Sequence, residues 1–206
     1  MKFLSALFFL SLLFFSPATS HAADFEVTPL FGYTFGGHLK DSDTDESIDF
    51  DDAINYGVIL GVRDDSKRGD AFYEILYSHQ STHLKSDQLL RPDNKRFDID
   101  IDYLHFGGRF GPYTEEMFKP YVVAGVGIAY FDPDQGDSET KFSFSIGGGA
   151  TVSLTEHIGL RFEGRAFGSV FKNNSSIFCS NNQCLVETKG DVLWQFSGFS
   201  GLVFSF

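Results

Sequence analysis

The feature that most constrains the fold is an alternation of apolar and polar residues with a period of two, which is clearest near the C-terminus. From position 192 the even positions are mostly apolar, while most of the odd positions between them are small or polar. The even positions carry Val192, Trp194, Phe196, Gly198, Ser200, Leu202, Phe204 and Phe206. Successive side chains of a β-strand point to opposite faces, whereas a helix repeats about every 3.6 residues. The segment is therefore predicted to be a strand with two chemically different faces.

Seven earlier segments show the same alternation, less regularly. The predicted strands span residues 24–37, 53–63, 70–79, 97–110, 120–131, 142–154, 158–170 and 192–206. The long connections cover 38–52, 80–96, 132–140 and 171–189, and the short ones cover 64–69, 111–118 and 155–157. Transmembrane barrels have short periplasmic turns and longer external loops. We therefore predict an all-β chain that forms an eight-stranded antiparallel up-and-down transmembrane β-barrel with both termini in the periplasm.

The fourth predicted strand changes the face of its apolar residues midway. In its first half Ile99 and Ile101 occupy odd positions between aspartates, whereas Leu104 and Phe106 occupy even positions in its second half. Two explanations stay open. A β-bulge near Asp102 reverses the two faces, or the Asp-rich half projects beyond the membrane.

Residues 1–22 are interpreted as a cleavable signal peptide. Lys2 precedes an apolar run over 3–15, and Ser20-His21-Ala22 offers small residues at the positions that a signal peptidase reads. The run is too short for a transmembrane helix, which needs about 20 residues. The mature chain, 23–206, is then a single barrel domain with a formal charge of −13, because only Lys2 is lost from a total of −12. A chain this acidic is not expected to bind nucleic acid through its overall field.

Alternation alone does not distinguish a membrane barrel from a soluble lipocalin-like barrel, which turns its apolar face inward. Three features favour the membrane. The connections differ in length between the two ends, aromatic residues lie near the strand ends, and the second face is small or charged, as a narrow lumen requires.

The final segment 200–206, Ser-Gly-Leu-Val-Phe-Ser-Phe, resembles the C-terminal strand of outer-membrane barrels, which ends in Phe after alternating apolar residues. Together with the signal peptide and the Gly- and aromatic-rich strands, residues 23–206 resemble the small eight-stranded barrels of the OmpA-domain and OmpX type. The resemblance implies a location in the outer membrane of a Gram-negative cell. It also implies that Phe204 and Phe206 are a signal for the barrel-assembly machinery.

Six charged residues fall on the polar faces of the predicted strands. They are Arg63, Glu74, Arg109, Arg161, Glu163 and Arg165. An eight-stranded barrel has an interior just wide enough for side chains to fill, and an unpaired buried charge is costly. We expect a charge network inside the lumen, and a gated path for an ion or small solute is the alternative.

An enzyme is the competing functional class. The sequence His79-Gln80-Ser81 resembles the His-x-Ser motif of lipid A deacylases, in which a His activates a Ser hydroxyl. Thr82 stands where that motif has Asn, and the sequence shows no convincing acid to orient the His. An exposed loop with His79 and His83 is favoured instead, so a non-enzymatic protein without a cofactor is expected.

The long connections are rich in charge. Residues 41–52 hold seven acidic side chains, which echo a calcium loop only faintly because Glu46 stands where the turn needs Gly. We favour a solvated acidic loop over a metal site. Such loops can share divalent cations with lipopolysaccharide, and cations near the loop bases can contact its phosphates directly. These are Lys40, Lys85, Arg91, Lys95, Arg96, Lys141, Lys172 and Lys189.

Two cysteines, Cys179 and Cys184, lie in the last long connection. In an exported protein the simplest expectation is one disulfide between them. Overall we expect a monomer that acts through its external loops, by surface interaction or by stabilising lipopolysaccharide and the membrane.

Overall fold

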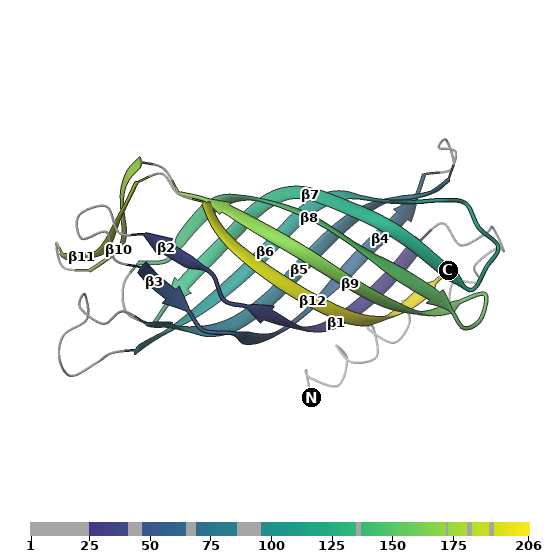
Figure 1. The fold of residues 1–206 in the computed structure, drawn as a ribbon, viewed down its shortest axis with the longest axis horizontal. Helices are drawn as coiled ribbons and strands as arrows, with labels where there is room; N and C mark the ends of the chain where they lie inside the picture. The colour runs from purple at the N-terminus through teal and green to yellow at the C-terminus, as the bar shows by residue number, and fades with distance from the viewer. Residues whose placement is uncertain are drawn as a thin grey trace, which may run out of the picture.

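The computed structural model describes residues 25–40, 47–64, 69–85, 96–134, 137–171, 173–180, 183–189 and 192–206. Eight strands form the wall of a barrel (Figure 1): β1 (Phe25–Phe35), β4 (Ala53–Arg63), β5 (Asp70–Lys85), β6 (Arg96–Gly111), β7 (Phe118–Pro133), β8 (Glu139–Ser153), β9 (Ile158–Val170) and β12 (Val192–Ser205). Two long connections contain short hairpins, built from β2 (His38–Lys40) with β3 (Ser47–Phe50) and from β10 (Asn173–Ser180) with β11 (Gln183–Lys189). The predicted signal peptide lies outside the described residues.

Every pairing in the wall is antiparallel, and the wall closes on itself. Around the ring the order is β1, β4, β5, β6, β7, β8, β9 and β12, and β12 pairs with β1 to complete it. A closed ring satisfies the backbone hydrogen bonds along the wall, which a strand must do inside a bilayer. The predicted eight-stranded up-and-down barrel is confirmed.

The two ends of the barrel differ, as Figure 1 shows. The β2–β3 and β10–β11 hairpins extend from one end, and the C-terminus lies at the other end with the short turns. We call these the loop end and the turn end. Among the described residues, no helix is long and apolar enough to cross a membrane.

The wall carries large apolar side chains on its outside. Outward-facing Phe31, Phe106 and Ile146 are 60%, 58% and 61% exposed, whereas their inward-facing neighbours Leu30, His105 and Ser145 are buried. A soluble barrel would bury these apolar side chains instead. The predicted assignment of apolar faces to the outside is therefore the one observed.

The expected boundary of the third strand is wrong. The sequence predicts that it ends at His79, but β5 continues to Lys85 and stays in one register with β6, from Asp70 opposite Gly111 to Lys85 opposite Arg96. Residues 80–85 look like a loop in sequence because many are polar. In the structure these polar positions belong to the wall near the loop end.

The fourth strand, β6, keeps an unbroken register and has no bulge against β5 or β7. Its odd positions face inward throughout, so Ile99, Ile101 and Tyr103 are buried in the barrel. The outward face of β6 is apolar from Leu104 towards the turn end and acidic from Asp102 towards the loop end. Of the two explanations, the structure agrees with a strand whose Asp-rich half extends past the apolar belt.

Candidate functional site

A chain of alternating charges crosses the lumen towards the turn end, centred on Arg161 of β9. Its guanidinium donates to both carboxylate oxygens of Glu74, at 2.7 and 3.0 Å. It also donates to Oε2 of Glu163, at 2.5 Å from Nη2 and 3.1 Å from Nε. The Arg161 side chain is 1% exposed. Such bidentate, charge-assisted bonds are the strong ones, and burial excludes competing water.

The network continues in both directions from this centre. Arg109 donates to Glu26 at 2.9 Å and lies 3.7 Å from Glu74, while Arg165 Nε donates to Glu163 at 2.7 Å. Tyr121 adds a hydroxyl that donates to Glu163 at 2.9 Å. The set contains three arginines and three glutamates, so its formal charges cancel. This neutrality makes a buried cluster of ions tolerable inside the barrel.

Five of the six predicted lumenal residues meet in this network, and Arg63 does not. Arg63 lies at the turn-end mouth, where it pairs with Asp70 at 3.2 Å and is 31% exposed. Sequence reasoning missed Glu26 and Tyr121. Glu26 had a usable signal, since it alternates with Phe25 and Val27 on the first strand, whereas Tyr121 reads as one of many aromatics.

Small neighbours make room for the large charged side chains. Glu163 lies opposite Gly149 of β8, and a Cβ at Gly149 would be 2.1 Å from the carbonyl oxygen of Phe162 and 2.7 Å from the Tyr121 hydroxyl. Both distances are shorter than any real Cβ contact. Glycine at position 149 is thus needed for Tyr121 to reach Glu163.

Towards the loop end the lumen is filled by an apolar plug. We use this name for the buried side chains Ile99, Ile101, Tyr103, Phe131, Phe167, Phe171 and Leu193. The rings of Tyr103 and Phe167 stack with centroids 4.4 Å apart. The Tyr103 hydroxyl donates to Gln195, 2.7 Å away, which also accepts a bond from Gln80. The charge network and the plug lie at two levels of the barrel interior, and other buried polar side chains, among them Asn55, His105 and Ser145, lie inside it as well.

Lys141 does not face outward, although it was one of the cations expected to contact lipid phosphates. It pairs with Glu139 and lies 5.4 Å from the centroid of the Phe171 ring, over the plug. For the other expected cations, the side chains of Lys40, Lys85, Arg91, Lys95, Arg96, Lys172 and Lys189 lie outside the described residues. The same holds for most of the acidic segment 41–52 and for the side chains of Cys179 and Cys184.

A second polar cluster lies on the outer wall, where β5 and β6 approach the loop end. His79 Nδ1 is 2.8 Å from Asp102 Oδ1, and Ser81 Oγ is 3.4 Å from His79 Nε2. The Tyr77 hydroxyl donates to the same Asp102 oxygen at 2.8 Å. Two expectations are corrected here: His79 lies in a strand and not in an exposed loop, and an orienting acid is present. The acid was missed because it depends on the register between β5 and β6.

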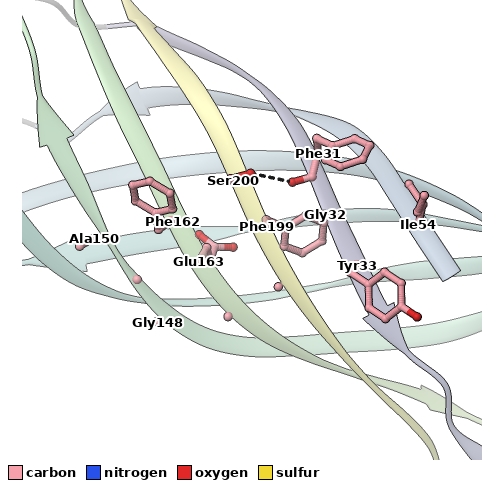
Figure 2. A pocket seen from close by; sticks show the side chains of 13 residues that line it. Phe31, Gly32, Tyr33, Ile54, Gly148, Ala150, Phe162, Glu163, Phe199 and Ser200 are labelled. Carbon is pink, nitrogen blue, oxygen red and sulfur yellow. Dashed lines mark hydrogen bonds between the residues drawn. The ribbon is translucent and has the colours of Figure 1, made fainter. Parts of the chain in front are cut away.

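The outer wall is hollowed elsewhere, across β8, β9 and β12. Gly148, Gly164 and Gly198 lie side by side in register, and a Cβ at Gly164 or Gly198 would meet nothing within 4 Å. The hollow measures about 860 Å³. Figure 2 shows Phe31 and Tyr33 along one side of it and Phe162 along the other. It is open and lined mainly by apolar and small residues, which suits contact with lipid chains.

Comparison with solved structures identifies the architecture. Neisserial surface protein A, from Neisseria, shares 14% sequence identity, with 91% of this chain and 100% of that chain covered and a TM-score of 0.62. The outer membrane protein OprG from Pseudomonas aeruginosa shares 12% identity over 91% of this chain and 98% of that chain, with a TM-score of 0.57. At these identities the similarity shows the fold alone. A comparison with curated protein sequences gave no match.

The family evidence comes from residues 6–183, which match the family described as the outer membrane protein beta-barrel domain. This match covers most of the chain and agrees with the closed ring, the apolar outer wall and the unequal ends. The chain belongs to the outer membrane protein beta-barrel family.

Proposed function

We propose that this protein is a sealed outer-membrane barrel that acts at the cell surface and not as a channel. The observation that supports this most is the filled lumen, in which the charge network and the apolar plug follow each other along the axis. A solute path would require both layers to move. Separating Arg161 from Glu74 alone breaks a buried bidentate ion pair, and breaking a buried pair costs about 3–5 kcal/mol.

The surface role that we propose is stabilisation of the lipopolysaccharide layer, together with interactions made by the external loops. In these roles the loops and the lumen act without catalysis. The described part of the outer rim is acidic, and Asp100 of β6 lies directly opposite Asp132 of β7. Like charges facing each other across strands repel. Contact between such a rim and lipopolysaccharide phosphates is therefore expected to run through shared divalent cations.

Four further assignments remain proposals. Phe204 and Phe206 face outward near the turn end, as the barrel-assembly signal would require, and we propose that the folded barrel is a monomer. Signal-peptide cleavage after Ala22 is proposed from the sequence alone. The backbones of Cys179 and Cys184 are direct partners in the β10–β11 hairpin. Antiparallel partners have Cα atoms roughly 4.5–5.5 Å apart, which suits a disulfide.

The proposed surface role is tested by binding the detergent-folded protein to vesicles that contain lipopolysaccharide, with and without millimolar Mg²⁺. We expect binding in Mg²⁺, loss of binding on chelation, and weakened binding when Asp100 and Asp132 are both changed to Asn. Vesicles without lipopolysaccharide serve as the control. Equal binding to both kinds of vesicle, or binding that chelation leaves unchanged, would contradict the proposal.

A further inference from the structure

We propose that Ser81, His79 and Asp102 form a hydrolytic site on the outer wall that cleaves acyl esters of outer-leaflet lipids. The site goes beyond the surface role proposed above. It rests on two contacts that link the three residues in the order serine, histidine and acid, which is the order that an activated serine requires.

The tautomer of His79 follows from its partners. A carboxylate can only accept hydrogen bonds, so Asp102 at Nδ1 requires the proton of a neutral His79 to be on Nδ1. Nε2 is then free to accept the proton of the Ser81 hydroxyl, whose oxygen is 3.4 Å away. This distance is long for a hydrogen bond, and catalytic bonds are commonly loose before substrate binds.

The three side chains are held by strands and not by a mobile loop. Positions 79 and 81 share the outward face of β5, and Asp102 lies opposite His79 on β6. The His79 ring lies against the Tyr56 ring of β4, with centroids 5.1 Å apart, and the Tyr77 hydroxyl holds the Asp102 carboxylate. Each member of the site except the nucleophile therefore has a second partner that fixes its orientation.

The neighbouring pair on the same two strands shows that this arrangement is not a general result of His facing Asp. His83 contacts Asp98 through Nε2, at 3.0 Å. In that pair Asp98 is bonded to Nε2, the nitrogen that would have to accept the proton of a serine hydroxyl. His83 and Asp98 therefore provide an internal control, since they share the strands, the face and the residue types of the proposed site.

The location selects the class of substrate. On the turn-end side of the site the same face is apolar, with Ile75, Leu104 and Phe106 at least 45% exposed. On the loop-end side the outward positions are Asp100, Asp98 and His83. The ester bonds of a lipid lie at this same boundary, between the acyl chains and the head groups. An acyl chain lying along the apolar wall would bring its ester carbonyl to Ser81.

The reaction balances with water as the only co-substrate. Ser81 Oγ attacks the ester carbonyl carbon while His79 Nε2 takes the hydroxyl proton. The carbon–oxygen bond to the lipid alcohol breaks, and the alcohol leaves with that proton. Water then attacks the acyl-serine, His79 takes a proton from it and returns it to Ser81 Oγ, and a free fatty acid departs. Asp102 stays ionised and stabilises the imidazolium in both steps.

The test uses the full mature chain folded into vesicles of two kinds, one of phosphatidylethanolamine and one containing lipopolysaccharide. Released fatty acids are measured by mass spectrometry, and an alkyl fluorophosphonate reports the reactive serine. The variants are S81A, H79N and D102N, with H83N as the matched control, and heat-modifiable gel migration confirms that each is folded. Release from either vesicle supports the site and identifies the source of the ester.

We expect wild-type and H83N proteins to release fatty acid and to carry the fluorophosphonate on Ser81. S81A should lose the label, and the folded H79N variant should lose activity by on the order of 100-fold or more. No release and no labelling by the wild-type protein would overturn the proposal. So would activity in folded S81A equal to that of the wild type, and neither result affects the proposed binding of lipopolysaccharide.

Discussion

Changing Arg161 to Met keeps a long side chain in the lumen but removes the guanidinium that binds Glu74 and Glu163. Four hydrogen bonds from Arg161 are lost, two to each carboxylate. Glu74 is then left with Arg109 at 3.7 Å and Arg165 at 3.9 Å. Removing one partner of a buried ion pair costs about 3–5 kcal/mol. We expect a loss of this size in the free energy of unfolding.

The assay is urea unfolding in lipid vesicles, followed by the fluorescence of Trp194, the single tryptophan of the chain. Lys119 near the turn-end mouth, changed to Met, controls for loss of a positive charge that is outside the network. The double variant E74Q/R161M should be less destabilised than the sum of its two single variants, because removing both partners leaves fewer unpaired charges. A loss below about 1 kcal/mol for R161M would refute the view that the network holds the barrel together.

Three other predictions concern two glycines of the wall, a pair of facing aspartates and the two cysteines. Gly149→Ala should destabilise the barrel by about 1–3 kcal/mol, because the new Cβ would meet the Phe162 carbonyl and the Tyr121 hydroxyl. Gly164→Ala should be tolerated, and unfolding of both variants in vesicles compares their free energies of unfolding. Asp132→Asn removes the repulsion from Asp100 and should stabilise the protein by about 0.2–1 kcal/mol at low salt, with the gain shrinking at high salt. The proposed disulfide predicts that denatured, unreduced protein resists alkylation at Cys179 and Cys184; two alkylated cysteines without reductant would contradict it.

Much of the fold could be predicted because the period-two pattern states directly which side chains share a face. It places Glu74, Arg161 and Glu163 inside and Phe106 and Phe196 outside without knowledge of the strand partners. Register is different, since it depends on how far each hairpin extends. Some of residues 80–85 are polar because they face the lumen, and others are polar because they lie outward beyond the apolar belt. Because both sets are polar, composition alone makes the segment look like a loop.

The same limitation explains which parts of the two sites were missed. Asp102 reaches His79 only through the pairing of β5 with β6, and the two residues are 23 positions apart in the chain. The apolar plug was also hidden, because Ile99 and Ile101 reverse the usual rule by being apolar and inward. Where a strand extends past the membrane, its outward face becomes polar and its inward face can become apolar. The sequence of β6 shows this change between Leu104 and Asp102.

The central claim is that the lumen is sealed, and conductance across planar bilayers tests it most directly. Wild-type protein inserted from detergent should give no stepwise current above that of the bare bilayer at moderate voltage. Folded R161M, with the plug still in place, should also be closed. Discrete, reproducible openings of the wild-type barrel would contradict the account and would favour the solute path that the filled lumen argues against.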